Sequence, residues 1–177
     1  MGKKIAQHLK VKLELILDDA TKSKLKSNSF DLIFSQGVVE HFKDPHHIIS
    51  EQIRILKKGG FLIIDVPQKF NPYTIFKHKK IKKGTWQYGW ETEFSLPRLK
   101  NLGKKYGLVP VESIGYGYGY GEDYNFNIIS SFGERFARKF TKLSLMGKLY
   151  TQVIRKMEQK YGAYFMLSVV VAFKKPQ

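Results

Sequence analysis

The sequence predicts an α/β fold with a mostly parallel sheet, and three observations carry that prediction. Residues 30–34 and 61–66 form two short apolar runs rich in bulky side chains, which is typical of buried strands. Apolar residues recur at helical spacing between the two runs. Strand, helix and strand in this order indicate a right-handed βαβ unit within a parallel sheet covered on both faces.

The amino-terminal residues predict a helix followed by a strand. Residues 3–10 are expected to be the last turns of a helix, and the alternating stretch from Val11 to Leu17 is expected to be a strand. This strand ends at Asp18, Asp19 and Ala20. A polar loop then leads to the strand of residues 30–34, which ends in Ser35, Gln36 and Gly37.

The helix between the two apolar runs is predicted from Pro45 to the glycine pair at 59 and 60. Its apolar face contains Ile48, Ile49, Ile53 and Leu56, and the glycines supply a stop signal. The strand of residues 61–66 follows at once and is closed by Pro67.

The carboxy-terminal part predicts one more helix and two strands. Ser95 can cap a helix that tolerates Pro97 in its first turn and ends at Gly107. A strand is expected over residues 108–114. The apolar run of residues 164–173 is expected to be the last strand.

The order of these features resembles the second half of a class I S-adenosylmethionine-dependent methyltransferase of the type 11-like kind. The strand that ends in small polar residues is followed by the pair Glu40-His41, by a helix ending in Arg-x-Leu-Lys-x-Gly-Gly, and by a strand ending in Pro67. The resemblance covers about residues 11–115 and 163–174. It implies a Rossmann-like, mostly parallel sheet whose last strand is antiparallel and inserted beside its neighbours.

The resemblance also implies a cofactor, S-adenosylmethionine, and places several residues in its site. Asp19 would meet the adenine amino group, with Ala20 supplying a backbone contact, although Asp18 and Asp19 can equally cap a turn. Ser35, Gln36 and Gly37 would contact the cofactor at the strand end. His41 is the catalytic candidate, as a base or as a group that orients a substrate hydroxyl; alternatively it only starts a helix.

The first part of such a fold is missing from the sequence. No glycine-rich turn and no second acidic strand end precede Asp19, so the first strands and the cofactor site are expected to be incomplete in this chain. Residues 111–119 contain a G-x-G-x-G pattern that would allow a circular permutation. If this stretch is extended, its glycines line one face and its tyrosines the other.

We expect one truncated domain over residues 1–177, with two insertions that act as a lid on the ligand side of the sheet. The insertions are residues 68–94, which are basic and aromatic, and residues 116–162, which contain a basic amphipathic helix. The aromatic candidates for contact with a substrate are Tyr73, Trp86, Trp90, Tyr116 and Tyr118.

Composition leaves the partner open. The chain has 177 residues, 42% hydrophobic residues, no cysteine and a net charge of +16, so a folded protein is expected and a disulfide framework is excluded. The charge can attract RNA, an anionic membrane surface or an acidic substrate, or it can serve solubility alone. We expect no metal, because the histidines form no ligand cluster, and a cytoplasmic location.

Two functions from different classes follow. The first is methyl transfer from S-adenosylmethionine to a small-molecule or lipid-like acceptor. The second is a non-catalytic methyltransferase-like binding module for RNA or a protein. Because the strands that would separate Val11–Leu17 from residues 30–34 are absent, the free strand edge is expected to pair within the chain or to form a homodimer.

Overall fold

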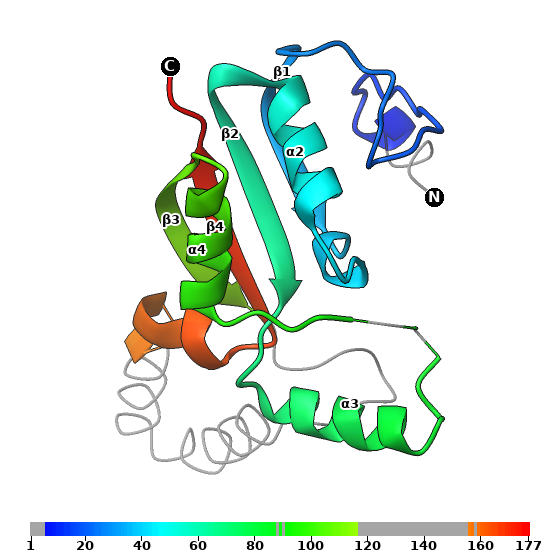
Figure 1. The fold of residues 1–177 in the computed structure, drawn as a ribbon, viewed down its shortest axis with the longest axis vertical. Helices are drawn as coiled ribbons and strands as arrows, with labels where there is room; N and C mark the ends of the chain where they lie inside the picture. The colour runs from blue at the N-terminus through cyan, green and yellow to red at the C-terminus, as the bar shows by residue number, and fades with distance from the viewer. Residues whose placement is uncertain (1–5, 88, 90, 117–155, 158) are drawn as a thin grey trace.

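The computed structural model describes residues 6–87, 89, 91–116, 156–157 and 159–177. Its elements are β1 (Phe30–Gln36), the 3₁₀ turn η1 (Val39–His41), α2 (His46–Ile55), β2 (Leu56–Pro67), α3 (Pro72–Lys82), α4 (Leu96–Lys105), β3 (Val109–Tyr116) and β4 (Ser168–Lys174). Residues 159–165 are also helical. Figure 1 shows α3 lying beyond the lower end of β2, apart from the sheet.

The four strands form one sheet in the order β1-β2-β4-β3. β1 and β2 are parallel, and β4 runs antiparallel to both of its neighbours, β2 and β3. This arrangement confirms the predicted fold class, including the last antiparallel strand inserted between two others. The strand begins at Ser168, however, because the expected first residues, Tyr164 and Phe165, belong to the preceding helical turn.

The βαβ unit formed by β1, α2 and β2 is confirmed, but α2 ends earlier than its glycine pair suggested. Leu56 already has extended backbone angles and starts β2. The Lys175 ammonium donates to the carbonyls of Ile53 and Leu56, each at 2.7 Å, and so satisfies acceptors that the end of the helix leaves open. The helix therefore ends where a lysine near the carboxyl terminus caps it.

The hydrophobic core lies on one face of the sheet. Alternate residues of β2 and β4 point to this face, and α2 and α4 pack on it; Figure 1 shows α4 in front of β3 and β4. Ser95 caps α4 as expected, since its hydroxyl accepts from the Arg98 amide at 3.4 Å. The main core side chains are Ile48, Ile49, Leu62, Ile64, Val66, Leu96, Leu99, Val169, Val171 and Phe173.

The opposite face of the sheet carries exposed apolar side chains. Register places Leu32 beside Phe61 and Phe34 beside Ile63 on this face, and Leu32 and Phe34 are more than half exposed. Ile114 on β3 is likewise exposed. Among the described residues, the prediction of a sheet covered on both faces is therefore correct for one face only. We call the other surface, formed by Phe30, Leu32, Phe34, Phe61 and Ile114, the open face.

The strand predicted from Val11 to Leu17 is wrong. These residues have no regular secondary structure, and Leu13, Leu15 and Leu17 are exposed. A strand needs a neighbour to satisfy its backbone groups, and in the described structure this segment has no strand partner. Of the helix expected over residues 3–10, the described part contains one helical turn at residues 6–8, and residues 3–5 lie outside the described residues.

Close packing of α4 on the sheet gives the first testable prediction. A Cβ at Gly103 would lie 2.2 Å from the ring of Phe173, which is fully buried. We expect Gly103→Ala to lower the free energy of unfolding by up to about 2 kcal/mol, because an overpacking cost of about 1–3 kcal/mol exceeds the gain in helix propensity of about 1 kcal/mol. Urea denaturation measures this change. Adding Phe173→Leu should recover part of the loss, and a Gly103→Ala protein as stable as the parent would show that α4 does not pack this closely.

Candidate functional site

The carboxyl ends of β1 and β2 lie side by side and form the rim on which the predicted cofactor residues are placed. Gln36 pairs with Asp65 in the register of these two parallel strands. Ser35 is buried, and its hydroxyl accepts a hydrogen bond from the Gln52 amide of α2 at 2.9 Å. The hydrogen bond between Gln52 and Ser35 therefore attaches the end of β1 to α2.

A polar network crosses the rim from β1 to β3. The Gln36 amide donates to the Asp65 carboxylate at 2.9 Å and to the Tyr116 hydroxyl at 2.8 Å, and the Tyr116 hydroxyl donates to Asp65. Burial together with the bond to Asp65 raises the pKa of Tyr116, so the phenol stays protonated. The side-chain amide of Gln36, predicted to contact a cofactor, is thus engaged within the protein.

Gly37 leaves an open backbone at the end of β1. Its φ of +65° lies in the left-handed region, and its amide donates to the Asp65 carbonyl at 3.2 Å. A Cβ at this position would meet only Glu40 Oε1, at 3.8 Å. The backbone of Gly37 can therefore be approached closely by a ligand.

Glu40 is the residue of this rim that sequence reasoning missed. It lies in η1 and is only 4% exposed, yet its Oε2 atom has no hydrogen-bond partner in the described structure. Burial raises the pKa of Glu40 above the ordinary 4.5, and the nearby Glu91 and Asp65 act in the same direction. A buried carboxylate oxygen without a partner is unusual in a protein and marks a position where a ligand can be bound.

His41, the predicted catalytic residue, is exposed beside Glu40. Its amide donates to the Val38 carbonyl at 3.1 Å within the 3₁₀ turn. The sequence pointed to this part of the site through the pair Glu40-His41. The structure shows that Glu40 is the buried member of the pair and that His41 is exposed.

A buried lysine holds the segment that follows α3 against that helix. The Lys77 ammonium is almost fully buried and lies 2.9 Å from Glu91 Oε2 and 2.5 Å from Glu93 Oε1. Burial opposes ionisation of Glu93, but the hydrogen bond and charge of Lys77 outweigh it, so the pKa of Glu93 is lowered. Thr92, between the two carboxylates, donates its amide to the Glu40 carbonyl at 2.8 Å. The same short segment thus connects this lysine cluster with the rim.

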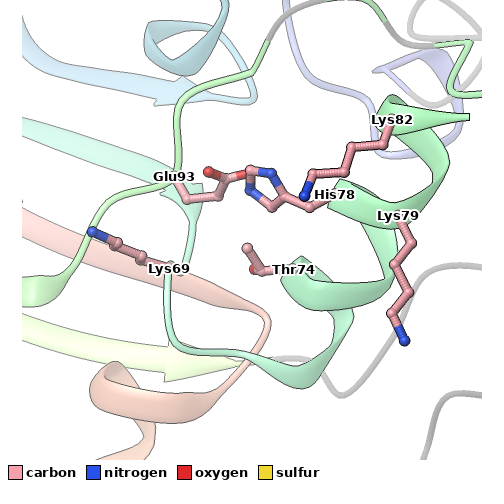
Figure 2. Close-up of a pocket in the computed structure, with 6 residues that line it drawn as sticks. All are labelled: Lys69, Thr74, His78, Lys79, Lys82 and Glu93. Atoms are coloured by element: carbon pink, nitrogen blue, oxygen red, sulfur yellow. The ribbon is translucent and has the colours of Figure 1, made fainter. Parts of the chain in front are cut away.

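A pocket of about 490 Å³ lies against α3 on the side of Glu93. Figure 2 shows His78 and Lys82 close together on α3, with Lys69 on the other side of Thr74. His78 Nε2 lies 3.2 Å from Glu93 Oε1, and the Thr74 hydroxyl donates to the Gln68 carbonyl at 2.8 Å. The lining residues are Lys69, Thr74, His78, Lys79, Lys82 and Glu93.

Asp19 and Ala20 lie away from the rim. The Asp19 carboxylate is exposed and accepts from the Thr21 amide at 2.8 Å and from the Thr21 hydroxyl at 2.7 Å, which is the turn-capping arrangement that the sequence left open. The nearby Ser23 amide donates to Glu51 on α2 at 2.8 Å. Figure 1 shows this amino-terminal segment beside the upper half of α2, whereas β1 ends lower down.

The aromatic lid candidates occupy different positions. Tyr73 is buried on α3, with its ring edge-on to Trp86 at a centroid distance of 6.3 Å. Tyr116 belongs to the rim network described above. Trp90 and Tyr118 lie outside the described residues, as does most of the second insertion. The structure brings Ser35, Gln36, Gly37 and Tyr116 together, but not Tyr73 or Trp86 with them.

Two further observations bear on the sequence predictions. The described residues contain no group of three or more potential metal ligands. In that same part of the chain, every helix is too short or too polar to cross a lipid bilayer.

Comparison with known families bears on the amino-terminal part of this site. A family model described as a methyltransferase domain matches residues 2–64. The predicted resemblance is confirmed. The matched residues include Ser35, Gln36, Gly37 and Glu40, so the rim of β1 lies inside the methyltransferase match. A search of curated proteins finds no match.

Solved structures share the fold at low sequence identity. A SAM-dependent methyltransferase from Thermotoga maritima, described as a possible histamine N-methyltransferase, is 20% identical with a TM-score of 0.63, covering 97% of this chain and 68% of that one. A Haloferax volcanii methyltransferase solved with the activator Trm112 is 15% identical with a TM-score of 0.55, covering 92% and 61%. The [4+2]-cyclase SpnF is 17% identical with a TM-score of 0.52, covering 98% and 60%.

These likenesses show a partial methyltransferase-like fold, and the Thermotoga protein of this fold is described as SAM-dependent. The chain spans 61% of the length of the Haloferax protein and 60% of the cyclase. Because one protein of this fold is a cyclase, the fold does not determine the reaction by itself.

The environment of Glu40 gives a prediction about pH. The folded state binds the Glu40 proton more tightly than the unfolded state does, because the pKa is raised above 4.5 on folding. The free energy of unfolding therefore falls as pH rises from 4.5 through the raised pKa, because the buried carboxylate becomes charged over this range. Glu40→Gln should gain stability relative to the parent over this range, with the difference closing below it.

Urea denaturation at a series of pH values measures this difference. Glu112→Gln, which removes an exposed carboxylate on β3, is the matched control for the loss of a negative charge. A Glu40→Gln curve parallel to that of the parent at every pH would contradict the prediction.

Proposed function

We propose that this chain is part of a methyltransferase catalytic domain that transfers a methyl group from S-adenosylmethionine to a small-molecule or lipid-like acceptor. The observation that carries the proposal is the buried Glu40 carboxylate with an unpartnered oxygen, directly beside the open backbone of Gly37 at the end of β1. Strand ends of an open α/β sheet are where ligands of such folds bind. The methyltransferase match over residues 2–64 supports this assignment.

The residues present fit one side of a cofactor site. Gly37 leaves room for a ligand against its backbone, and Ser35 and Gln36 hold the strand end in place through Gln52 and Asp65. When bound, the cofactor supplies a methyl group on a positively charged sulfur. Asp19 and Ala20 lie away from the rim, and Asp19 accepts hydrogen bonds from Thr21. We propose that residues other than these two complete the cofactor site.

Glu40 has the properties required of a group that receives the acceptor. Its free oxygen can accept a hydrogen bond from a hydroxyl or an amine, and when ionised it can take a proton from that group. Burial makes the ionised carboxylate more basic than one in water. We propose that His41, exposed on the same turn, orients the acceptor rather than acting as the base.

Calorimetric titration with S-adenosylmethionine and S-adenosylhomocysteine tests the proposal. We expect weak but saturable binding to the purified chain. Gly37→Ala should reduce the affinity by about tenfold, or 1.4 kcal/mol, because its methyl group occupies the space left for the ligand.

Gly59→Ala is the matched control for this experiment. Gly59 has a φ of +77°, with open space around it, so alanine causes the same backbone strain of about 1–2 kcal/mol as at Gly37. It lies at the opposite end of β2 and should leave cofactor affinity unchanged. A folded chain that binds neither compound, or equal losses in both variants, would overturn the proposal.

A non-catalytic binding module for RNA or a protein is the second candidate function. The open face favours it, because exposed apolar side chains on a sheet are typical of surfaces that contact another macromolecule. The same titration separates the two candidates, since only the catalytic proposal requires the cofactor.

We also propose that two copies of the chain associate through the segment from Val11 to Leu17. β1 is an edge strand of the sheet, and the segment from Val11 to Leu17 is exposed along its whole length, including its apolar residues Val11, Leu13 and Leu15. Light scattering should give twice the chain mass of 20.6 kDa, and Leu13→Lys with Leu15→Lys should return the protein to that mass. Val109→Lys with Val111→Lys, on the other edge strand, is the control. A parent protein of 20.6 kDa would contradict the dimer.

A further inference from the structure

Two side chains of the rim are carboxylates that are buried without a cationic partner. Glu40 is 4% exposed and Asp65 is 3% exposed. Across the described residues, neither carboxylate forms an ion pair with a lysine or an arginine. Asp65 accepts hydrogen bonds from the neutral side chains of Gln36 and Tyr116, whereas Glu40 Oε2 has no partner. A buried negative charge is costly unless a cation compensates it, and contacts within the described chain supply none.

The other charged groups that act on Glu40 do not supply that cation. Burial raises the pKa of Glu40, His41 on the same turn lowers it, and Glu91 and Asp65 raise it again. Lys77 pairs with Glu91 but also bonds a second carboxylate of the same segment, so its one charge is shared. The surroundings of Glu40 are therefore mainly negative, although the whole chain carries a net charge of +16.

The exposed backbone of Gly37 lies beside both carboxylate residues. Its amide donates to the Asp65 carbonyl at 3.2 Å, and a Cβ at this position would lie 3.8 Å from Glu40 Oε1. A ligand that approaches the end of β1 at Gly37 therefore comes next to the Glu40 carboxylate.

The open face continues the rim with apolar surface. Alternate residues of a strand share a face, and register places Phe34 beside Ile63 and Gln36 beside Asp65. Phe34 is 57% exposed, and Tyr116, whose hydroxyl bonds to Asp65, is 41% exposed. A ligand with its charge at the rim can therefore lay an aromatic or aliphatic part against these rings.

Protonation offers a simpler explanation for Glu40 alone. Its pKa is raised by burial, so a neutral carboxyl needs no cation. Such a carboxyl would still leave Oε2 without a hydrogen-bond partner. Asp65 accepts from both of its side-chain partners, as an ionised carboxylate does, so protonation of Glu40 leaves the charge of Asp65 uncompensated.

The charge of the rim decides which class of ligand fits. A neutral hydroxyl can bond to Glu40 but leaves the buried charge uncompensated, whereas an ammonium group does both. An anion is repelled. A metal ion lacks ligands, because the described residues contain no group of three potential metal ligands.

We propose that the rim binds an ammonium group carried on an apolar body, and that Glu40 receives the ammonium. The assignment of this ligand as the methyl acceptor rests on the function proposed above, whereas the binding of the cation does not. An ammonium that gives one proton to Glu40 becomes a neutral amine, and the lone pair on its nitrogen is then free to accept a methyl group.

Calorimetric titration with benzylamine at neutral pH and about 0.15 M salt, without S-adenosylmethionine, tests the proposal. We expect saturable binding. Benzyl alcohol, which has a similar shape without the charge, should bind at least about tenfold more weakly. The net charge of +16 repels a cation, so attraction by the whole chain cannot produce this binding.

Glu40→Gln keeps the shape of the side chain and removes its charge. It should weaken the binding of benzylamine by about tenfold. Glu112→Gln, which removes an exposed carboxylate from β3, is the matched control and should bind benzylamine as the parent does. Equal weakening in the two variants would show a general effect of charge, and that outcome overturns the proposal.

Proton release distinguishes a contact with Glu40 from a structural effect of the variant. An ammonium favours the ionised form of Glu40, so binding between pH 4.5 and the raised pKa should release protons in the parent but not in Glu40→Gln. Titration in two buffers of different ionisation enthalpy measures the release. Because His41, Glu91 and Asp65 also act on Glu40, the difference between the two proteins assigns the proton.

Three outcomes separate this proposal from methyl transfer. A folded chain that binds S-adenosylmethionine but not benzylamine overturns the ammonium site and leaves the proposed methyl transfer intact. A chain that binds benzylamine but no cofactor supports the site and overturns its assignment to a methyl acceptor. Benzyl alcohol that binds as tightly as benzylamine overturns the site whatever the cofactor does.

Discussion

The structure depends on the antiparallel pairing of β4 with two strands at once. β4 joins β2 on one side and β3 on the other, so the strand nearest the carboxyl terminus is central in the sheet. Its inward residues, Val169, Val171 and Phe173, are fully buried and connect the part of the core under α2 with the part under α4. Lys175, just beyond β4, also caps α2. Without this strand, the βαβ unit and the α4-β3 unit have no common core.

Hydrogen bonds between neighbouring strands hold the rim in place. Asp65 accepts bonds from Gln36 and from Tyr116, so side chains from three strands converge on one carboxylate. This network holds the end of β1 and thereby the position of Gly37, whose amide is bonded to the Asp65 carbonyl. Glu40, in contrast, keeps an oxygen without a partner. A fixed backbone beside an unsatisfied carboxylate is the arrangement expected of a preorganised site rather than of a packing detail.

The sequence predicted the helices and strands that depend on local residue patterns. It did not predict element ends and strands that depend on contacts with residues far away in the chain. β1, the second half of β2 and α4 follow from apolar runs and from the cap at Ser95, whereas the start of β2 at Leu56 was predicted as helix. The end of α2 depends on Lys175, more than a hundred residues away, and the stretch from Val11 to Leu17 lacks the partner that a strand requires. At the rim, Ser35 and Gly37 were identified, but Glu40 was not preferred over His41, because burial cannot be read from adjacent residues.

The open face gives the high positive charge a physical role that involves no specific ligand. Leu32 and Phe34 expose apolar surface that would bring molecules together in water, whereas a net charge of +16 makes molecules of this protein repel one another. Colloidal stability is thus a balance between one sheet surface and the lysines of the whole chain. Salt screens the repulsion without weakening the apolar attraction, so ionic strength governs how concentrated a solution of this protein can become.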